Sequence, residues 1–169
     1  MTCCSLEEKI YARADALHGA DMDLRDNAAH ALKARVIDER HGPQPDHRPH
    51  VPADRTVFYE LHVKGFTQRH PGVPEALRGS FAGLASDAAL VHLKALGVTT
   101  LCLLPVHQHV DERRLVGLGL TNYWGYNTLA FFCPDAGLSS GAGGLSPREE
   151  FRAMVRRLRI TSTEASWNC

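Results

Sequence analysis

Hydrophobic and polar positions are most clearly ordered in the middle of the chain. Residues 56–63, TVFYELHV, are β-branched and aromatic and predict a strand. Residues 86–97 place leucines near one helical face between a Ser86 cap and a Gly97 stop, which predicts a helix. Residues 99–106, TTLCLLPV, are almost wholly apolar, as in a strand buried on both faces of a parallel sheet. This order predicts a βαβ unit.

The residues around this unit extend the pattern. Residues 64–86 carry Gly and Pro at intervals, and we expect a long loop there. A helical pattern resumes at residues 146–158, SPREEFRAMVRRL, where Ser146 is the cap and Pro147 the first helical residue. Glu149 completes a capping box with that serine. The element order is that of an α/β fold.

The N-terminal part has a different character. Residues 7–17 predict a short helix, whereas residues 26–55 are rich in Pro, His and charge and predict an extended linker. Its histidines, His41, His47 and His50, lack any accompanying cysteine or carboxylate pattern. We therefore interpret them as solvated linker residues rather than metal ligands.

Composition narrows the possible functions. The apolar content of 44% is enough for a core, and 19 basic residues balance 19 acidic ones. This balance favours neither a nucleic-acid partner nor a membrane surface. No apolar run approaches a membrane span, the start lacks an apolar signal region, and five cysteines without a C-x-x-C spacing give no disulfide framework. We expect a reduced, cytoplasmic setting, no cofactor, and no calcium site.

The segment 121–135, TNYWGYNTLAFFCPD, is the candidate for chemistry. Two aromatic rings on either side of Gly125 suit stacking on a sugar ring. The same residues suit a packed corner of a core. The residues by themselves leave both interpretations open.

Three segments together carry a family resemblance: VFYELHVKGFT, LKALGVTTLCLLPVHQH and NYWGYNTLAFFCPD. They resemble the start of the catalytic barrel in α-amylase-superfamily enzymes, and more narrowly bacterial glycogen debranching enzymes and isoamylases. YARADALHG and DNAAHALKARVID resemble the approach to that barrel, so the resemblance covers residues 10–158. The motif NYWGYN after a strand ending in LLPVH is typical of the debranching branch. Branching enzymes and trehalose-releasing hydrolases share the start of the barrel and stay as alternatives.

The resemblance implies a fold and a reaction. The fold class is α/β, the βαβ start of an incomplete (β/α)8 TIM barrel, with residues 1–54 as N-terminal segment and linker, 55–158 as barrel and 159–169 as an aberrant tail. The family reaction is retaining hydrolysis of α-1,6-glucosidic branch linkages in glycogen or limit dextrin. It uses an Asp nucleophile, a Glu acid/base and a stabilising Asp from the fourth, fifth and seventh strands. The active site of such a barrel lies at the carboxyl ends of its strands.

The resemblance also implies substrate-binding residues. Tyr126 stacks on the sugar next to the scissile bond, Gly125 permits a close backbone approach, and Trp124 supports the loop. Tyr126 and Trp124 are the two residues that we expect to bind substrate. Tyr123 is the residue of this group most readily assigned to packing. Further polar candidates fall into two groups: Glu60 and His62 with structural roles, and Gln108 and Asn127 near the mouth of the barrel without an assigned role.

The tail departs from the family pattern. After the last helix the family has a glycine turn and an apolar third strand ending in Asn-His, whereas residues 159–169 read RITSTEASWNC. We therefore expect no third strand, no catalytic carboxylates and no catalytic residue in this chain. A shifted reading frame or a truncated gene is the simplest hypothesis. The chain is then an inactive member of the debranching family or, alternatively, a non-catalytic fragment that binds α-glucan weakly.

Overall fold

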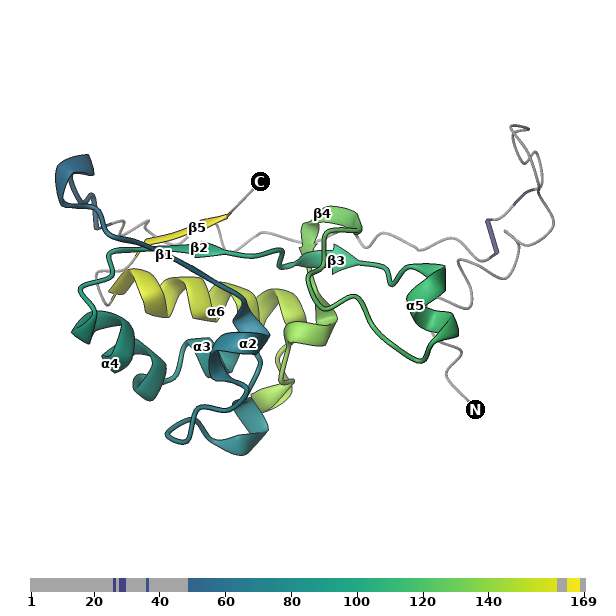
Figure 1. The fold of residues 1–169 in the computed structure, drawn as a ribbon, viewed down its shortest axis with the longest axis horizontal. Helices are drawn as coiled ribbons and strands as arrows, with labels where there is room; N and C mark the ends of the chain where they lie inside the picture. The colour runs from purple at the N-terminus through teal and green to yellow at the C-terminus, as the bar shows by residue number, and fades with distance from the viewer. Residues whose placement is uncertain (1–25, 27, 30–35, 37–48, 161–163, 168–169) are drawn as a thin grey trace. The chain divides into compact units, whose positions relative to one another are not determined.

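The computed structural model describes residues 26, 28–29, 36, 49–160 and 164–167 (Figure 1). The chain divides into a larger unit, residues 45–109 with 123–169, and a smaller unit, residues 1–44 with 110–122. The expected helix over residues 7–17 and most of the expected linker lie outside the described residues.

A parallel sheet organises the larger unit. Strand β1, Phe58–Leu61, pairs with β2, Thr100–Leu103, and the helix α4, Asp87–Ala95, connects them. Phe58 lies opposite Thr100 in this register. The predicted βαβ unit is therefore confirmed (Figure 1).

A third strand joins this sheet, contrary to our expectation. Strand β5, Glu164–Trp167, pairs in parallel with β2, so the strand order is β1-β2-β5. The expectation failed because strand pairing is made by the backbone: an open edge of β2 offers N–H and C=O groups to any extended segment that reaches it. A search for an apolar run does not detect such a strand.

Both predicted long helices form with the expected caps. In α4 the Ser86 hydroxyl accepts a hydrogen bond from the amide of Ala89, and Gly97 follows the helix with φ of 72°. The helix α6, Pro147–Ile160, begins with the predicted capping box. Glu149 Oε2 accepts hydrogen bonds from the Ser146 amide at 2.9 Å and the Ser146 hydroxyl at 2.6 Å. These hydrogen bonds lower the pKa of Glu149.

The expected long loop over residues 64–86 contains short helices instead. They are α2, Val63–Thr67, the 3-10 turn η3, Glu75–Leu77, and α3, Phe81–Leu84. Side-chain caps explain α2 and α3: the imidazole of His62 and the hydroxyl of Ser80 accept hydrogen bonds from the first amides of each helix. Four or five residues are too few to show a helical period in the sequence.

The core lies between the sheet and the helices α3, α4 and α6 (Figure 1). Phe81 and Phe151 meet edge to face there, with ring centroids 5.2 Å apart. The opposite face of the sheet is more open, since Phe58 is 67% exposed and Cys102 is only half-buried. The expectation that β2 is buried on both faces is therefore wrong at Cys102. The core cluster comprises Leu61, Val63, Phe81, Leu84, Leu90, Leu93, Val98, Leu101, Leu103, Val106, Leu138, Phe151, Met154 and Leu158.

A second, antiparallel pair of strands follows β2. Strand β3, His107–His109, pairs with β4, Thr128–Pro134, with irregular register between them. Short 3-10 turns complete the larger unit: η2, Ala53–Arg55, η4, Ala136–Leu138, and η5, Ala142–Gly144.

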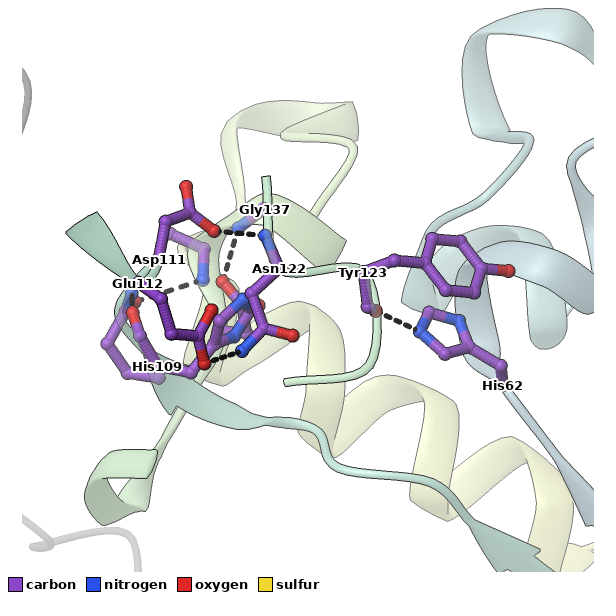
Figure 2. Close-up of polar contacts among 10 residues, drawn as sticks. His62, His109, Asp111, Glu112, Asn122, Tyr123 and Gly137 are labelled. Carbon is purple, nitrogen blue, oxygen red and sulfur yellow. Dashed lines mark hydrogen bonds and ion pairs between the residues drawn. The ribbon is translucent and has the colours of Figure 1, made fainter. Parts of the chain in front are cut away.

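The smaller unit is described mainly over residues 110–122. It contains the helix α5, Arg113–Gly117. Asp111 Oδ1 accepts a hydrogen bond from the Asn122 amide, and Asn122 Nδ2 donates to Glu112 Oε1 at 3.0 Å (Figure 2). These contacts tie the two ends of the segment together. Across the described parts of both units, no helix has the length and apolar character needed to cross a bilayer.

Candidate functional site

A groove of about 870 Å³ in the larger unit is the candidate site. It is formed where the chain leaves the carboxyl end of β2, together with β4 and the first turns of α6. Two predicted site residues, Tyr126 and Asn127, line it, whereas Trp124, Tyr123 and Gln108 do not. The lining residues are Pro105, Val106, His107, Tyr126, Asn127, Thr128, Phe131, Phe132, Pro134, Arg148, Phe151 and Arg152.

Tyr126 presents its ring at the surface of this groove. It is 68% exposed, so its ring is open to a ligand in the groove. Phe131 and Phe132 in β4 add further exposed rings to the lining. The groove therefore offers flat apolar faces that suit the CH-rich faces of sugar rings.

Gly125 is required by the backbone that precedes Tyr126. Its φ is 74°, in the left-handed region that favours glycine. A Cβ atom there would lie 3.3 Å from Pro105 Cβ and 3.4 Å from His109 Nδ1. The close backbone approach expected at Gly125 is therefore made to other parts of the protein.

His62 fixes the other end of this loop. Its Nε2 donates to the Tyr123 carbonyl at 2.7 Å, and its ring stacks on that of Tyr123 with centroids 4.2 Å apart (Figure 2). Because Nδ1 accepts hydrogen bonds from the amides of Lys64 and Gly65, the proton resides on Nε2. Burial lowers the pKa of His62, against the opposing effect of its hydrogen bond to Tyr123. These contacts give His62 the structural role that we expected.

Trp124 lies against this same pair of rings. Its ring meets Tyr123 edge to face at 5.3 Å and His62 at 6.0 Å. A Cβ atom on Gly65 would lie 2.4 Å from the Tyr123 hydroxyl, so this glycine makes room for the stack. Tyr123 and Trp124 thus contact each other and His62 while remaining 45% and 55% exposed, whereas Tyr126 lines the groove.

A close contact between His109 and Asp135 beneath the loop was not anticipated from the sequence. His109 Nδ1 lies 2.9 Å from Asp135 Oδ2, and the two side chains are 17% and 9% exposed. Asp135 is held in turn, because its amide donates to the Val106 carbonyl and its Oδ1 accepts from the Gly137 amide, each at 2.8 Å. His109 and Asp135 are 26 residues apart in the sequence, and no helical or strand period connects two residues at that distance.

Glu150 is a second feature that the sequence did not reveal. Its side chain is 2% exposed and accepts hydrogen bonds from the Ser139 hydroxyl and the amides of Ala82, Ser140 and Gly141, at 2.7 to 3.1 Å. Burial raises the pKa of this carboxyl, but the hydrogen bonds outweigh that effect and the pKa is lowered. Glu150 therefore anchors α6 to α3 and to the loop after η4.

The groove carries binding groups rather than acid/base groups. None of its described lining residues is Asp or Glu; its charged side chains are Arg148 and Arg152. Retaining glycoside hydrolysis needs two carboxyl groups about 5–5.5 Å apart. Across the described ranges, no cluster of three or more His, Cys, Asp or Glu side chains is placed to hold a metal ion. This arrangement suits ligand contact by stacking.

In sequence, the chain is similar to proteins named glycogen debranching enzyme. The chain is 50% identical over 142 residues to a glycogen debranching enzyme of Yersinia pestis bv. Antiqua, a match that covers 84% of this chain. That match spans only 22% of the relative, so the chain corresponds to about a fifth of the length of its curated relatives. No protein-family model matches the chain.

Solved structures with a similar fold are pullulanases. The pullulanase of Anoxybacillus sp. LM18-11 superposes with a TM-score of 0.61 at 22% identity, over 78% of this chain and 20% of that enzyme. Its complex with maltotriose gives 0.60 at 25% identity, over 79% and 20%. The described fold is therefore that of a small α/β part of these larger enzymes.

Proposed function

From the premise that this chain belongs, over the matched residues, to the glycogen debranching enzymes of the α-amylase superfamily, we propose that it contributes the α-glucan-contacting groove of such an enzyme. Tyr126 is the sugar-stacking residue. Trp124 acts with Tyr123 to support the loop that carries it. The ligand is a short α-glucan chain of the kind present in the maltotriose complex of the related pullulanase.

The observation that carries this proposal is the exposed ring of Tyr126 in the groove that Pro105 and Val106 also line, just beyond the carboxyl end of β2. Ligands of α/β sheets and barrels bind at the carboxyl ends of the strands. The groove lies at that end of β2, and its lining is mainly aromatic and apolar. An aromatic face gives dispersion and CH–π contact to a sugar ring without requiring a charged partner.

The sheet supports a finer proposal about the fold. Strands β1, β2 and β5 lie side by side in parallel in this order, with α4 between the first two and the β3–β4 pair followed by α6 between the last two. Consecutive strands of a (β/α)8 barrel have this relationship. We take the three strands as the first three of such a barrel.

The reaction of the whole enzyme is retaining hydrolysis of α-1,6 branch linkages, with carboxylates that the described groove does not contain. We propose that this chain on its own binds glucan without cleaving it. Incubation with a branched glucan should release no reducing sugar above a buffer control, while a pullulanase in the same assay should release it. Release that persists through repurification and follows the chain on a sizing column would contradict this part of the proposal.

Binding is tested with maltotriose by isothermal titration calorimetry. Aromatic stacking is worth about 1–3 kcal/mol by alanine substitution in comparable platforms, so Tyr126→Ala should weaken binding on the order of tenfold to a hundredfold. Tyr126→Phe keeps the ring and should bind within about threefold of the native chain. Phe58→Ala removes an exposed ring outside the groove and serves as the matched control. Equal affinity of the native chain and Tyr126→Ala would refute the proposed role.

A further inference from the structure

We propose that His109 and Asp135 are positioning residues for Tyr126: the contact between their side chains holds the backbone at Gly125 so that the Tyr126 ring faces the groove. This inference rests on the proposed sugar contact of Tyr126. It assigns a task to two side chains that do not line the groove and therefore act through the loop.

His109 meets the chain both just before and just after Tyr126 in the sequence. Its ring lies against Gly125, the residue before Tyr126, where an added Cβ would come within 3.4 Å of Nδ1. Its backbone lies opposite Thr128, two residues after Tyr126, in the β3–β4 register. One residue thus contacts the chain just before the tyrosine and pairs with it just after.

Asp135 keeps the His109 ring in one place. The aspartate is itself fixed by its amide bond to the Val106 carbonyl and by the Gly137 amide on Oδ1, which leaves Oδ2 directed at His109 Nδ1, 2.9 Å away. Removing one member of a nearly buried pair leaves the other without its partner, so the ring orientation is lost together with the pair.

The two ends of the loop are held by different contacts. His62 acts on the Tyr123 carbonyl and ring, three residues before Tyr126, whereas His109 and Asp135 influence the His62 imidazole only through their charges. The backbone at Gly125 has a positive φ and passes between Pro105 and His109. Loss of the His109 ring removes one wall of that passage while the His62 support remains.

The test uses the full chain with 3-fluorotyrosine incorporated at Tyr126, read by fluorine NMR, together with maltotriose titration. His109→Ala and Asp135→Asn should each broaden or shift the Tyr126 signal in the absence of ligand and weaken maltotriose binding by about fivefold or more. The double variant should be no worse than the more damaging single variant, because both remove one interaction. His109→Asn places an amide donor near the position of Nδ1 and should recover part of both effects.

Ser86→Ala is the matched control, because it weakens the α4 cap, and α4 contributes no residue to the groove or the loop. It should lower the melting temperature while the fluorine signal and the affinity stay native. The inference is overturned if His109→Ala leaves the fluorine signal unchanged, or if the two single effects on the signal and the affinity add fully in the double variant. Absence of maltotriose binding by the native chain would refute the proposed function, and the ligand-free fluorine signal would still decide the positioning role.

Discussion

The helix-covered core and the Tyr126 loop are built by different means within one unit. In the core, buried apolar side chains of α3, α4 and α6 meet one face of the sheet. In the loop, a glycine with positive φ, a histidine stack and the His109–Asp135 contact hold exposed rings in place. The core is stabilised by burial, whereas the loop is shaped by a few polar contacts. Stability and ligand contact should therefore respond to different substitutions.

The largest expected effect is in the core. Phe81 is fully buried and packs edge to face on Phe151, so Phe81→Ala should cost about 3–5 kcal/mol of unfolding free energy. Phe132→Ala is the matched control, since that ring is 100% exposed and its loss should leave the urea midpoint within error. Similar urea midpoints for Phe81→Ala and Phe132→Ala would mean that burial does not explain the difference in stability between the core and the exposed rings.

An intermediate effect is expected at Glu150, with a defined pH dependence. Its pKa is lowered in the folded chain, so the unfolded chain binds the proton more tightly and the contribution to stability is complete above the unfolded pKa of about 4.3. That contribution is lost as pH falls through the lower folded value. Glu150→Gln should cost about 1–3 kcal/mol at pH 7 and reduce the loss of stability below pH about 4.5.

Urea midpoints measured from pH 7 to pH 3 check this expectation. Glu149→Gln is a useful companion, because that carboxylate also has a lowered pKa but is exposed on the first turn of α6. If the urea midpoint of Glu150→Gln fell between about pH 4.5 and pH 3 as steeply as that of the native chain, other groups would control the pH dependence of stability.

The smallest expected effect on stability is at the α6 cap. Ser146→Ala removes the hydroxyl that meets Glu149 and should cost about 1 kcal/mol. Thermal melting followed by circular dichroism measures it. If Ser146→Ala lowered the free energy of unfolding as much as Phe81→Ala, the capping box would stabilise the fold as strongly as a buried core residue, which would contradict this ranking.

The same contrast explains what the sequence could predict. Ser86, Gly97 and the Ser146 capping box are local signals, so both long helices were predicted together with the βαβ unit. Gly125 and Tyr126 were recognised because the motif that contains them is characteristic of a family. Local patterns and motifs therefore identified the elements and the loop.

The remaining features depend on contacts between distant residues. His109 meets Asp135 across 26 positions, and Glu150 receives the amide of Ala82 across 68. Strand β5 pairs through its backbone with β2, and its sequence lacks the apolar run by which a buried strand is recognised. Such contacts leave no periodic trace in the sequence, because only the folded chain brings the partners together.

The direct test of the Tyr126 proposal is a nuclear Overhauser measurement between maltotriose and aromatic rings of the native chain. We predict cross-peaks from sugar ring protons to the Tyr126 ring that disappear in Tyr126→Ala while the core signals of Phe81 and Phe151 stay unchanged. Maltotriose cross-peaks confined to Trp124 or Tyr123, with none at Tyr126, would contradict the account: the sugar would then be held by the rings that we assign to packing.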